Sequence, residues 1–169
     1  QDCVNDVIKI SDKNNKEVLT TLGNYVSPFN NFTLLRVKYD SAGEITVNVE
    51  YTYTDEDKNL INAKLDELWK TVVTKDMKTE DIIYAFHDYF INTTRYDEAY
   101  ESELNQGIKT THVSSKANGV LFEGYAICSG YTDAMALVLD RLNVPNFKVA
   151  STTHVWNAVK INDNWLHLD

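Results

Sequence analysis

The chain has 169 residues, of which 43% are hydrophobic and 24% are charged, a balance typical of a globular protein with one hydrophobic core. Its 16 basic and 25 acidic residues give a formal charge of −9, which repels nucleic-acid phosphates and anionic lipid surfaces. We therefore expect no nucleic-acid partner. Since no apolar run reaches the roughly 18 residues of a membrane-spanning helix, we also expect no membrane insertion.

The stretch from Val4 to about Thr54 is predicted to form strands and turns. Residues 45–53 alternate apolar or aromatic with polar side chains, and the turn signal Ser41-Ala-Gly43 precedes them. This pattern is expected for a strand entered through a hairpin, with residues 32–39 as its partner.

Two helices are predicted next, because the spacing of apolar residues changes from two to 3.6. The first spans roughly residues 55–74, and Thr54 with Asp57 fits a capping box at its start. The second starts near Thr79 and ends around residues 92–94. Both have one apolar face, so both are expected to pack on the core.

The second half of the chain is predicted to hold a loop, a helix and three short strands. Residues 95–120 are polar and without clear periodicity, which predicts a long connecting loop. A helix starts at Cys128 and is stopped by Asn143-Val-Pro145. The expected strands are residues 147–151, 154–161 and 165–169, with a tight turn at residues 162–164.

Cys128 is the first candidate functional residue. It lies where Gly124-Tyr-Ala-Ile-Cys-Ser-Gly130 passes into the predicted helix, near free backbone N–H groups and the positive end of the helix dipole. Such a position favours the nucleophilic thiolate. The alternative is a small buried hydrophobic residue without chemistry. The other cysteine, Cys3, is too distant in sequence for a zinc spacing or a disulfide framework.

His154 and Asp169 are the candidate partners of Cys128. With a two-residue turn within residues 162–164, cross-strand partners have position numbers with an odd sum, such as 161 with 164. This register places His154 on the same sheet face as Asp169, within reach of a hydrogen bond. A cysteine at a helix start, a histidine and a carboxylate meet the need for a nucleophile, a base and an orienting group.

The C-terminal part of the chain resembles the bacterial transglutaminase-like core. The resemblance rests on Cys128-Ser-Gly-Tyr131, on His154-Val-Trp-Asn157 and on Trp165-Leu-His-Leu-Asp169. It extends upstream through Ile83-Tyr-Ala-Phe-His-Asp-Tyr-Phe-Ile-Asn-Thr-Thr-Arg-Tyr-Asp97, which is similar to the His-Asp-Tyr helix of many bacterial members. The resemblance implies a Cys-His-Asp triad in papain-like geometry, with Cys128 as nucleophile, His154 as base and Asp169 as orienting acid.

We expect one α+β domain over residues 1–169, with a papain-like transglutaminase core in which the catalytic helix packs on a small antiparallel sheet. The core is expected over residues 79–169, after a variable, strand-rich N-terminal extension over residues 1–75, and the two predicted helices precede the catalytic helix. The resemblance also implies that family members continue beyond the aspartate, whereas this chain stops at Asp169. We therefore expect a truncated chain whose last strand is incompletely supported.

Several other residues were weighed for a role in the site. Tyr125 and Trp156 are the candidate substrate-binding residues, and the backbone N–H of Cys128 is the expected oxyanion donor. Phe122 and Trp165 are further candidates for the wall of the substrate site. The sequence offers no reason to give His167 a chemical role, and His87 beside Asp88 is expected to be solvated or to cap its helix.

The expected reaction is thiol-dependent acyl transfer on peptide or protein amides, by a cysteine protease-like or amidase-type hydrolase. The alternatives are a protein-glutamine transglutaminase or deamidase, and a non-catalytic binding or scaffold module. We expect a monomer without cofactor or metal. The substrate is expected to be a protein or peptide, including cell-wall peptide, met outside the cell or at its surface, with the cytoplasm as the alternative location.

Overall fold

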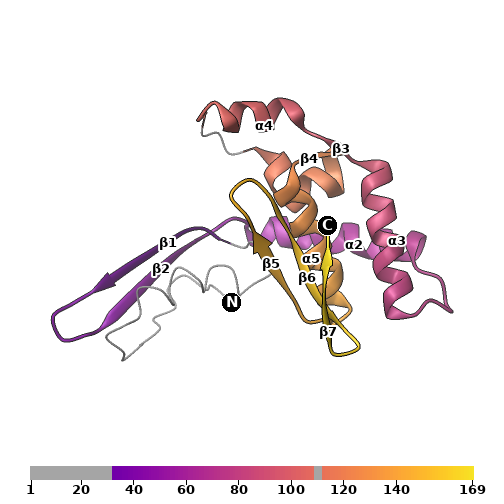
Figure 1. Cartoon of the computed structure of the whole chain (residues 1–169), viewed down its shortest axis with the longest axis horizontal. Helices are drawn as coiled ribbons and strands as arrows, with labels where there is room; N and C mark the ends of the chain where they lie inside the picture. The colour runs from indigo at the N-terminus through magenta and orange to yellow at the C-terminus, as the bar shows by residue number, and fades with distance from the viewer. Residues whose placement is uncertain (1–31, 109–111) are drawn as a thin grey trace.

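The computed structural model describes residues 32–108 and 112–169. The strands and turns expected over residues 4–31, and the cysteine at position 3, lie outside the described residues. The described part begins with the predicted hairpin, formed by β1 (Phe32–Tyr39) and β2 (Ile45–Tyr51), which extends away from the helices (Figure 1). Its turn is closed by the Asp40 carboxylate, which accepts bonds from two backbone N–H groups at 2.9 Å.

Both helices predicted from the 3.6-residue period are confirmed. They are α2 (Asp55–Val72) and α3 (Thr79–Thr93). The capping box at the start of α2 is present, since Asp57 N–H donates to Thr54 Oγ1 (3.1 Å) and Thr54 N–H donates to Asp57 Oδ2 (2.9 Å). These reciprocal bonds satisfy N–H groups that a helix start otherwise leaves unpaired.

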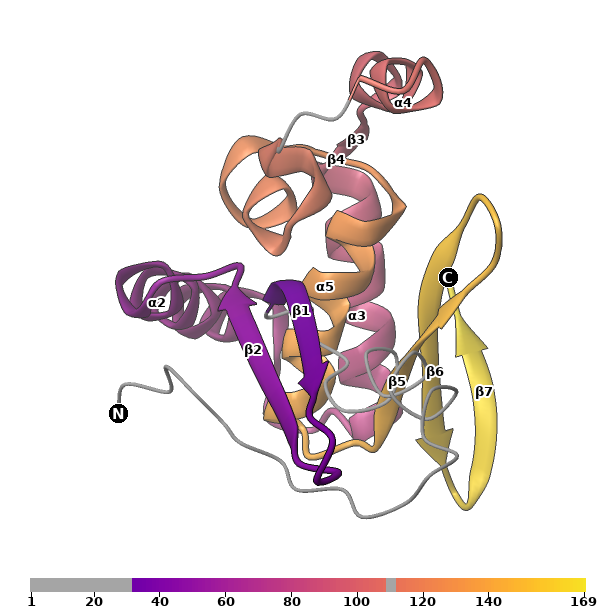
Figure 2. The same cartoon turned by 90° about the vertical axis from the view of Figure 1, so that its left-hand side faces the viewer.

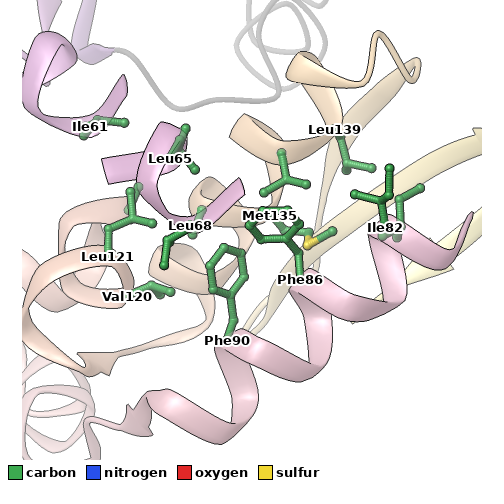
Figure 3. Close-up of a cluster of buried hydrophobic side chains, with 14 of the residues drawn as sticks. Ile61, Leu65, Leu68, Ile82, Phe86, Phe90, Val120, Leu121, Met135 and Leu139 are labelled. Atoms are coloured by element: carbon green, nitrogen blue, oxygen red, sulfur yellow. The ribbon is translucent and has the colours of Figure 1, made fainter. Parts of the chain in front are cut away.

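The core lies where α2 and α3 meet the helix α5 (Cys128–Arg141). Figure 3 shows side chains from these helices and from the segment around Val120 converging in one cluster. Phe86 of α3 is fully buried and its ring packs at 5.1 Å from Trp69 and 5.8 Å from Phe90, measured between centroids. The buried face of α5 also holds Asp133, which is 1% exposed and pairs with Lys148 Nζ at 2.7 Å.

The prediction of a long connecting loop over residues 95–120 is wrong. This stretch contains β3 (Arg95–Tyr96), α4 (Glu98–Asn105) and two short helical turns, η1 (Val113–Ser115) and η2 (Gly119–Glu123). Each element is too short to give a periodic pattern, so tertiary contacts rather than amphipathicity stabilise it. The start of α4 is capped by Asp97, whose side chain accepts from the N–H of buried Tyr100 (3.1 Å).

The three predicted C-terminal strands form an antiparallel sheet in the order β5-β6-β7. They are β5 (Asn146–Ala150), β6 (Val155–Ile161) and β7 (Asn164–Leu168). The two turn residues, Asn162 and Asp163, have φ values of 48° and 63°, which fit a type I′ hairpin. Ile161 pairs with Asn164, so the odd-sum register is confirmed.

The elements that surround α5 decide where the candidate site lies. Helix α5 packs on β6 and on α3, and the three-stranded sheet stands beside these helices (Figure 2). A short parallel pair, β3 with β4 (Tyr125–Ala126), precedes α5. The structure is therefore an α+β fold with a helix seated on a small antiparallel sheet. Within residues 32–108 and 112–169, no helix is both long and apolar enough to cross a membrane.

Candidate active site

Cys128 is the first residue of α5, as the sequence predicts. It is half-buried and its thiol is free. The helix start is fixed from outside, because the N–H of Ile127 donates to Ser114 O (2.9 Å). Gly130 lies in the same close contact, since a Cβ there would be only 2.5 Å from Ser114 O. The sulfur thus projects from the first turn of the helix, the end at which backbone N–H groups point outward.

His154 and Asp169 are hydrogen bonded to each other. His154 Nε2 lies 2.8 Å from Asp169 Oδ1 and 2.9 Å from Oδ2. His154 precedes β6 and Asp169 follows β7, so the hairpin register brings them together across 15 positions of sequence. A carboxylate only accepts, so Nε2 is the donor and Nδ1 is left for another proton transfer.

The ring of His154 is oriented by its neighbours as well as by the carboxylate. It stacks on Trp156, with centroids 5.5 Å apart and an interplanar angle of 22°. Trp156 is itself fixed by a bond from its Nε1 to His167 Nδ1 (2.7 Å). His167 therefore contacts the wall of the site through Trp156, without lining the cavity itself.

Cys128, His154 and Asp169 line one cavity of about 220 Å³. It lies between α3, α5 and the β6–β7 hairpin, and most of its wall is apolar. The apolar lining residues include Phe90, Ile91, Tyr131, Met135 and Leu168. A cavity with apolar walls and a few convergent polar groups is typical of a ligand or substrate site.

The substrate-binding predictions are met differently by their two residues. Trp156 lines the cavity, whereas Tyr125 does not. Successive residues of a strand point to opposite faces, and in β4 the buried side is taken by Ala126, so Tyr125 is 49% exposed. Phe122 and Trp165 are also exposed and lie outside the cavity lining.

His87 is a residue of the site that the sequence reasoning missed. It was expected to be solvated or to cap its helix, but it lines the cavity. Its Nε2 lies 3.2 Å from the main-chain oxygen of Asp169, and its Nδ1 lies 3.2 Å from Asp88 Oδ1. The available signal was its helical position, four residues after buried Ile83 and within the inward face of α3.

Tyr96 adds a hydroxyl next to the backbone amide of Cys128. Its O–H donates to Glu101 Oε1 at 2.9 Å. Burial, followed by the bond to Glu101, raises the pKa of Tyr96 well above its usual range, so the hydroxyl is neutral at physiological pH.

Thr132 joins the nucleophile helix to the histidine strand. Its hydroxyl lies 2.8 Å from Cys128 O and 3.0 Å from Val155 O, the carbonyl that follows His154. The buried Asn157 side chain donates to the main-chain oxygen of Thr132 at 3.2 Å. The contacts of Thr132 with Val155 O and with the Asn157 side chain link α5 to β6. Within the described residues, no group of three His, Cys, Asp or Glu side chains lies where it could hold a metal ion.

The fold is similar to that of a solved transglutaminase. The two structures superpose with a TM-score of 0.61 over 98% of this chain, at 17% sequence identity. No family model matches the sequence, and no curated protein sequence matches it. The chain spans about half the length of that transglutaminase, 49% of which is covered. The chain thus has a transglutaminase-like fold.

Proposed function

We propose that this protein is a thiol-dependent acyl-transfer enzyme acting on peptide or protein amides. Cys128 is the nucleophile, His154 the base and acid, and Asp169 the orienting carboxylate. The observation that carries the proposal is the bond from His154 Nε2 to Asp169, on a cavity that Cys128 also lines. This bond leaves Nδ1 of His154 to exchange a proton with the thiol.

The proposed reaction has two steps. The Cys128 thiolate attacks the amide carbonyl carbon, an S–C bond forms, the C–N bond breaks, and His154 gives its proton to the departing nitrogen. The acyl group is then held as a thioester. An amine or water attacks this thioester, His154 takes the proton of the attacking group, and the thiolate leaves. Cys128 N–H stabilises the oxyanion in both steps.

Transfer to a primary amine is the outcome that we propose for the second step, in place of the hydrolysis expected from sequence. The sequence indicated no channel that keeps an amine free of water. The cavity beside Cys128 has apolar walls, and such a wall favours the neutral, nucleophilic form of an amine. The likeness to a solved transglutaminase supports the same outcome.

Hydrolysis is the second candidate, because water has access to the base. The side chain of His154 is 41% exposed and that of Asp169 is 60% exposed. A water molecule that reaches His154 can attack the thioester, which converts a glutamine side chain to glutamate or cleaves a peptide bond. For either outcome we propose that the substrate is a protein or peptide. We also propose that the enzyme is a monomer and that it acts outside the cell.

The deciding experiment supplies a glutamine-containing peptide and an excess of a fluorescent primary amine. We expect the amine to be incorporated, with release of ammonia, and Cys128→Ala to abolish incorporation. Cys3→Ala is the matched control and should retain it. Acid formation or peptide cleavage without incorporation would replace amine transfer by hydrolysis. No turnover of any amide would favour the non-catalytic binding module.

A further inference from the structure

We propose that His87 is a positioning residue, which holds the main chain of Asp169 so that the Asp169 carboxylate stays on His154. This inference rests on the proposed roles of Cys128, His154 and Asp169. It starts from the contact between His87 Nε2 and Asp169 O, 3.2 Å across 82 positions of sequence.

The bond between His154 and Asp169 needs a second support. Both side chains are partly exposed, at 41% and 60%, and a polar contact between exposed groups contributes little free energy to its own geometry. Asp169 also lies one residue beyond β7, which among residues 32–108 and 112–169 pairs with β6 on one side only. The orientation of its carboxylate therefore depends on what fixes its backbone.

Helix α3 provides a rigid platform for that support. Ile83, Phe86 and Phe90 bury its inner face in the core, and the end of β7 lies beside this helix (Figures 1 and 2). The His87 side chain is 29% exposed, much less than that of Asp169. His87 thus connects α3, which is held in the core, to the end of strand β7.

The partners of His87 indicate which of its ring nitrogens donates to Asp169. The carbonyl of Asp169 and the carboxylate of Asp88 are both acceptors. Both contacts are hydrogen bonds only when both ring nitrogens carry protons, whereas the neutral Nε2–H tautomer keeps the bond to Asp169 alone. The donor that positions Asp169 is therefore Nε2–H, and the contact with the exposed Asp88 is secondary.

The test compares four variants in the full chain. His87→Ala removes the donor, and His87→Gln replaces it with an amide N–H at a similar distance along the side chain. Asp88→Asn leaves Nε2 in place, and Tyr84→Ala, at an exposed position of the same helix, controls for damage to α3. The first readout is the rate of Cys128 alkylation by iodoacetamide at pH 7. We expect His87→Ala to lower this rate about fivefold, the equivalent of one hydrogen bond, and the other three variants to stay within about twofold of the wild type.

The second readout does not depend on catalysis. Imidazole resonances of His154 are followed by NMR in the wild type, in His87→Ala, in His87→Gln and in Asp169→Asn. We expect His87→Ala to move them toward their positions in Asp169→Asn, and His87→Gln to leave them near the wild type. If His87→Ala leaves them unmoved, or if Asp169→Asn does not move them, the inference is wrong. If these shifts are as expected but the wild type turns over no amide, the proposed function is overturned and the positioning role of His87 stands.

Discussion

At the scale of single residues, the candidate site depends on which atoms each neighbour leaves available. Asp169 accepts a hydrogen bond from Nε2 of His154, so Nδ1 is the nitrogen that remains for the proposed proton exchange with the thiol. Cys128 takes the first position of α5, so its sulfur lies at the end of the helix that favours negative charge. Neither property belongs to the residue type alone, since both come from position.

The first prediction concerns the reactivity of the two cysteines. Below pH 7, Cys128 should alkylate about tenfold faster than Cys3, because Cys128 begins helix α5 and shares a cavity with His154, its proposed base. His154→Ala should remove the difference. Peptide mass spectrometry after reaction with iodoacetamide measures both sites in one sample.

Tyr84→Ala is the control for that prediction. It removes an exposed side chain that does not line the cavity and leaves Cys128, His154 and Asp169 in place, so the difference between the cysteines should remain. Equal alkylation rates at Cys128 and Cys3 in the wild type would contradict an activated nucleophile.

At the scale of secondary-structure elements, the site is a junction between α5 and the β6–β7 hairpin. Helix α5 supplies Cys128, and the hairpin supplies His154 and Asp169 from its two outer ends. A shift of one element relative to the other would separate Cys128 from His154. The bond from the Thr132 hydroxyl to Val155 O opposes such a shift.

The second prediction removes this link. Thr132→Val keeps the shape of the side chain but loses the hydroxyl, so the unfolding free energy should fall by about 1 kcal/mol and Cys128 alkylation should slow about fivefold. Thr132→Ser, which keeps the hydroxyl, should have nearly the unfolding free energy and the Cys128 alkylation rate of the wild type. Urea unfolding and the alkylation assay provide the measurements. Unchanged reactivity in Thr132→Val would show that α5 and β6 are held by other contacts.

The third prediction concerns the acid stability of the segment around α4. The pKa of Asp97 is lowered, chiefly by the hydrogen bond from the Ser114 hydroxyl and next by the N–H of Tyr100. A lowered pKa stabilises the fold fully above the ordinary aspartate pKa of about 3.9, and this stability is lost as the pH falls through the lower folded-state value.

Asp97→Asn isolates that contribution, because asparagine has no charge to lose. The wild type should be more stable than Asp97→Asn by about 1 kcal/mol at pH 7, and the difference should shrink as the pH falls below about 4. Urea unfolding at pH 7 and pH 3 measures it. A difference that is the same at both pH values would rule out the carboxylate charge as its cause.

At the scale of the whole molecule, one core ties the helices to the sheet. Phe86 lies at its centre, fully buried between α2 and α5 (Figure 3). The cavity lies at the edge of the same core, since Phe90 and Met135 belong to both. The stability of the core and the shape of the site are therefore coupled.

The fourth prediction tests the place of Phe86 in this core. Phe86→Ala should lower the unfolding free energy by about 3–5 kcal/mol, whereas Phe86→Leu should lower it by less than about 2 kcal/mol. Denaturant unfolding followed by tryptophan fluorescence provides the measurement. A loss below about 1 kcal/mol in Phe86→Ala would mean that the core is not organised around this ring.

The sequence by itself determined the features that depend on neighbouring residues. The capping box at Thr54, the start of α5 at Cys128 and the hairpin register at residues 161–164 follow from local backbone chemistry and short periodicities. Because the register fixes which residues share a face, it also predicted that His154 and Asp169 meet.

Only the tertiary structure decided the features that depend on distant segments. The elements within residues 95–120 are too short to carry a period, and they exist because Tyr100 and Ser114 are buried against other parts of the chain. His87 reaches Asp169 because α3 packs beside the end of β7. Residues 82 positions apart leave no local pattern, since their contact is set by the packing of whole elements rather than by the residues next to them.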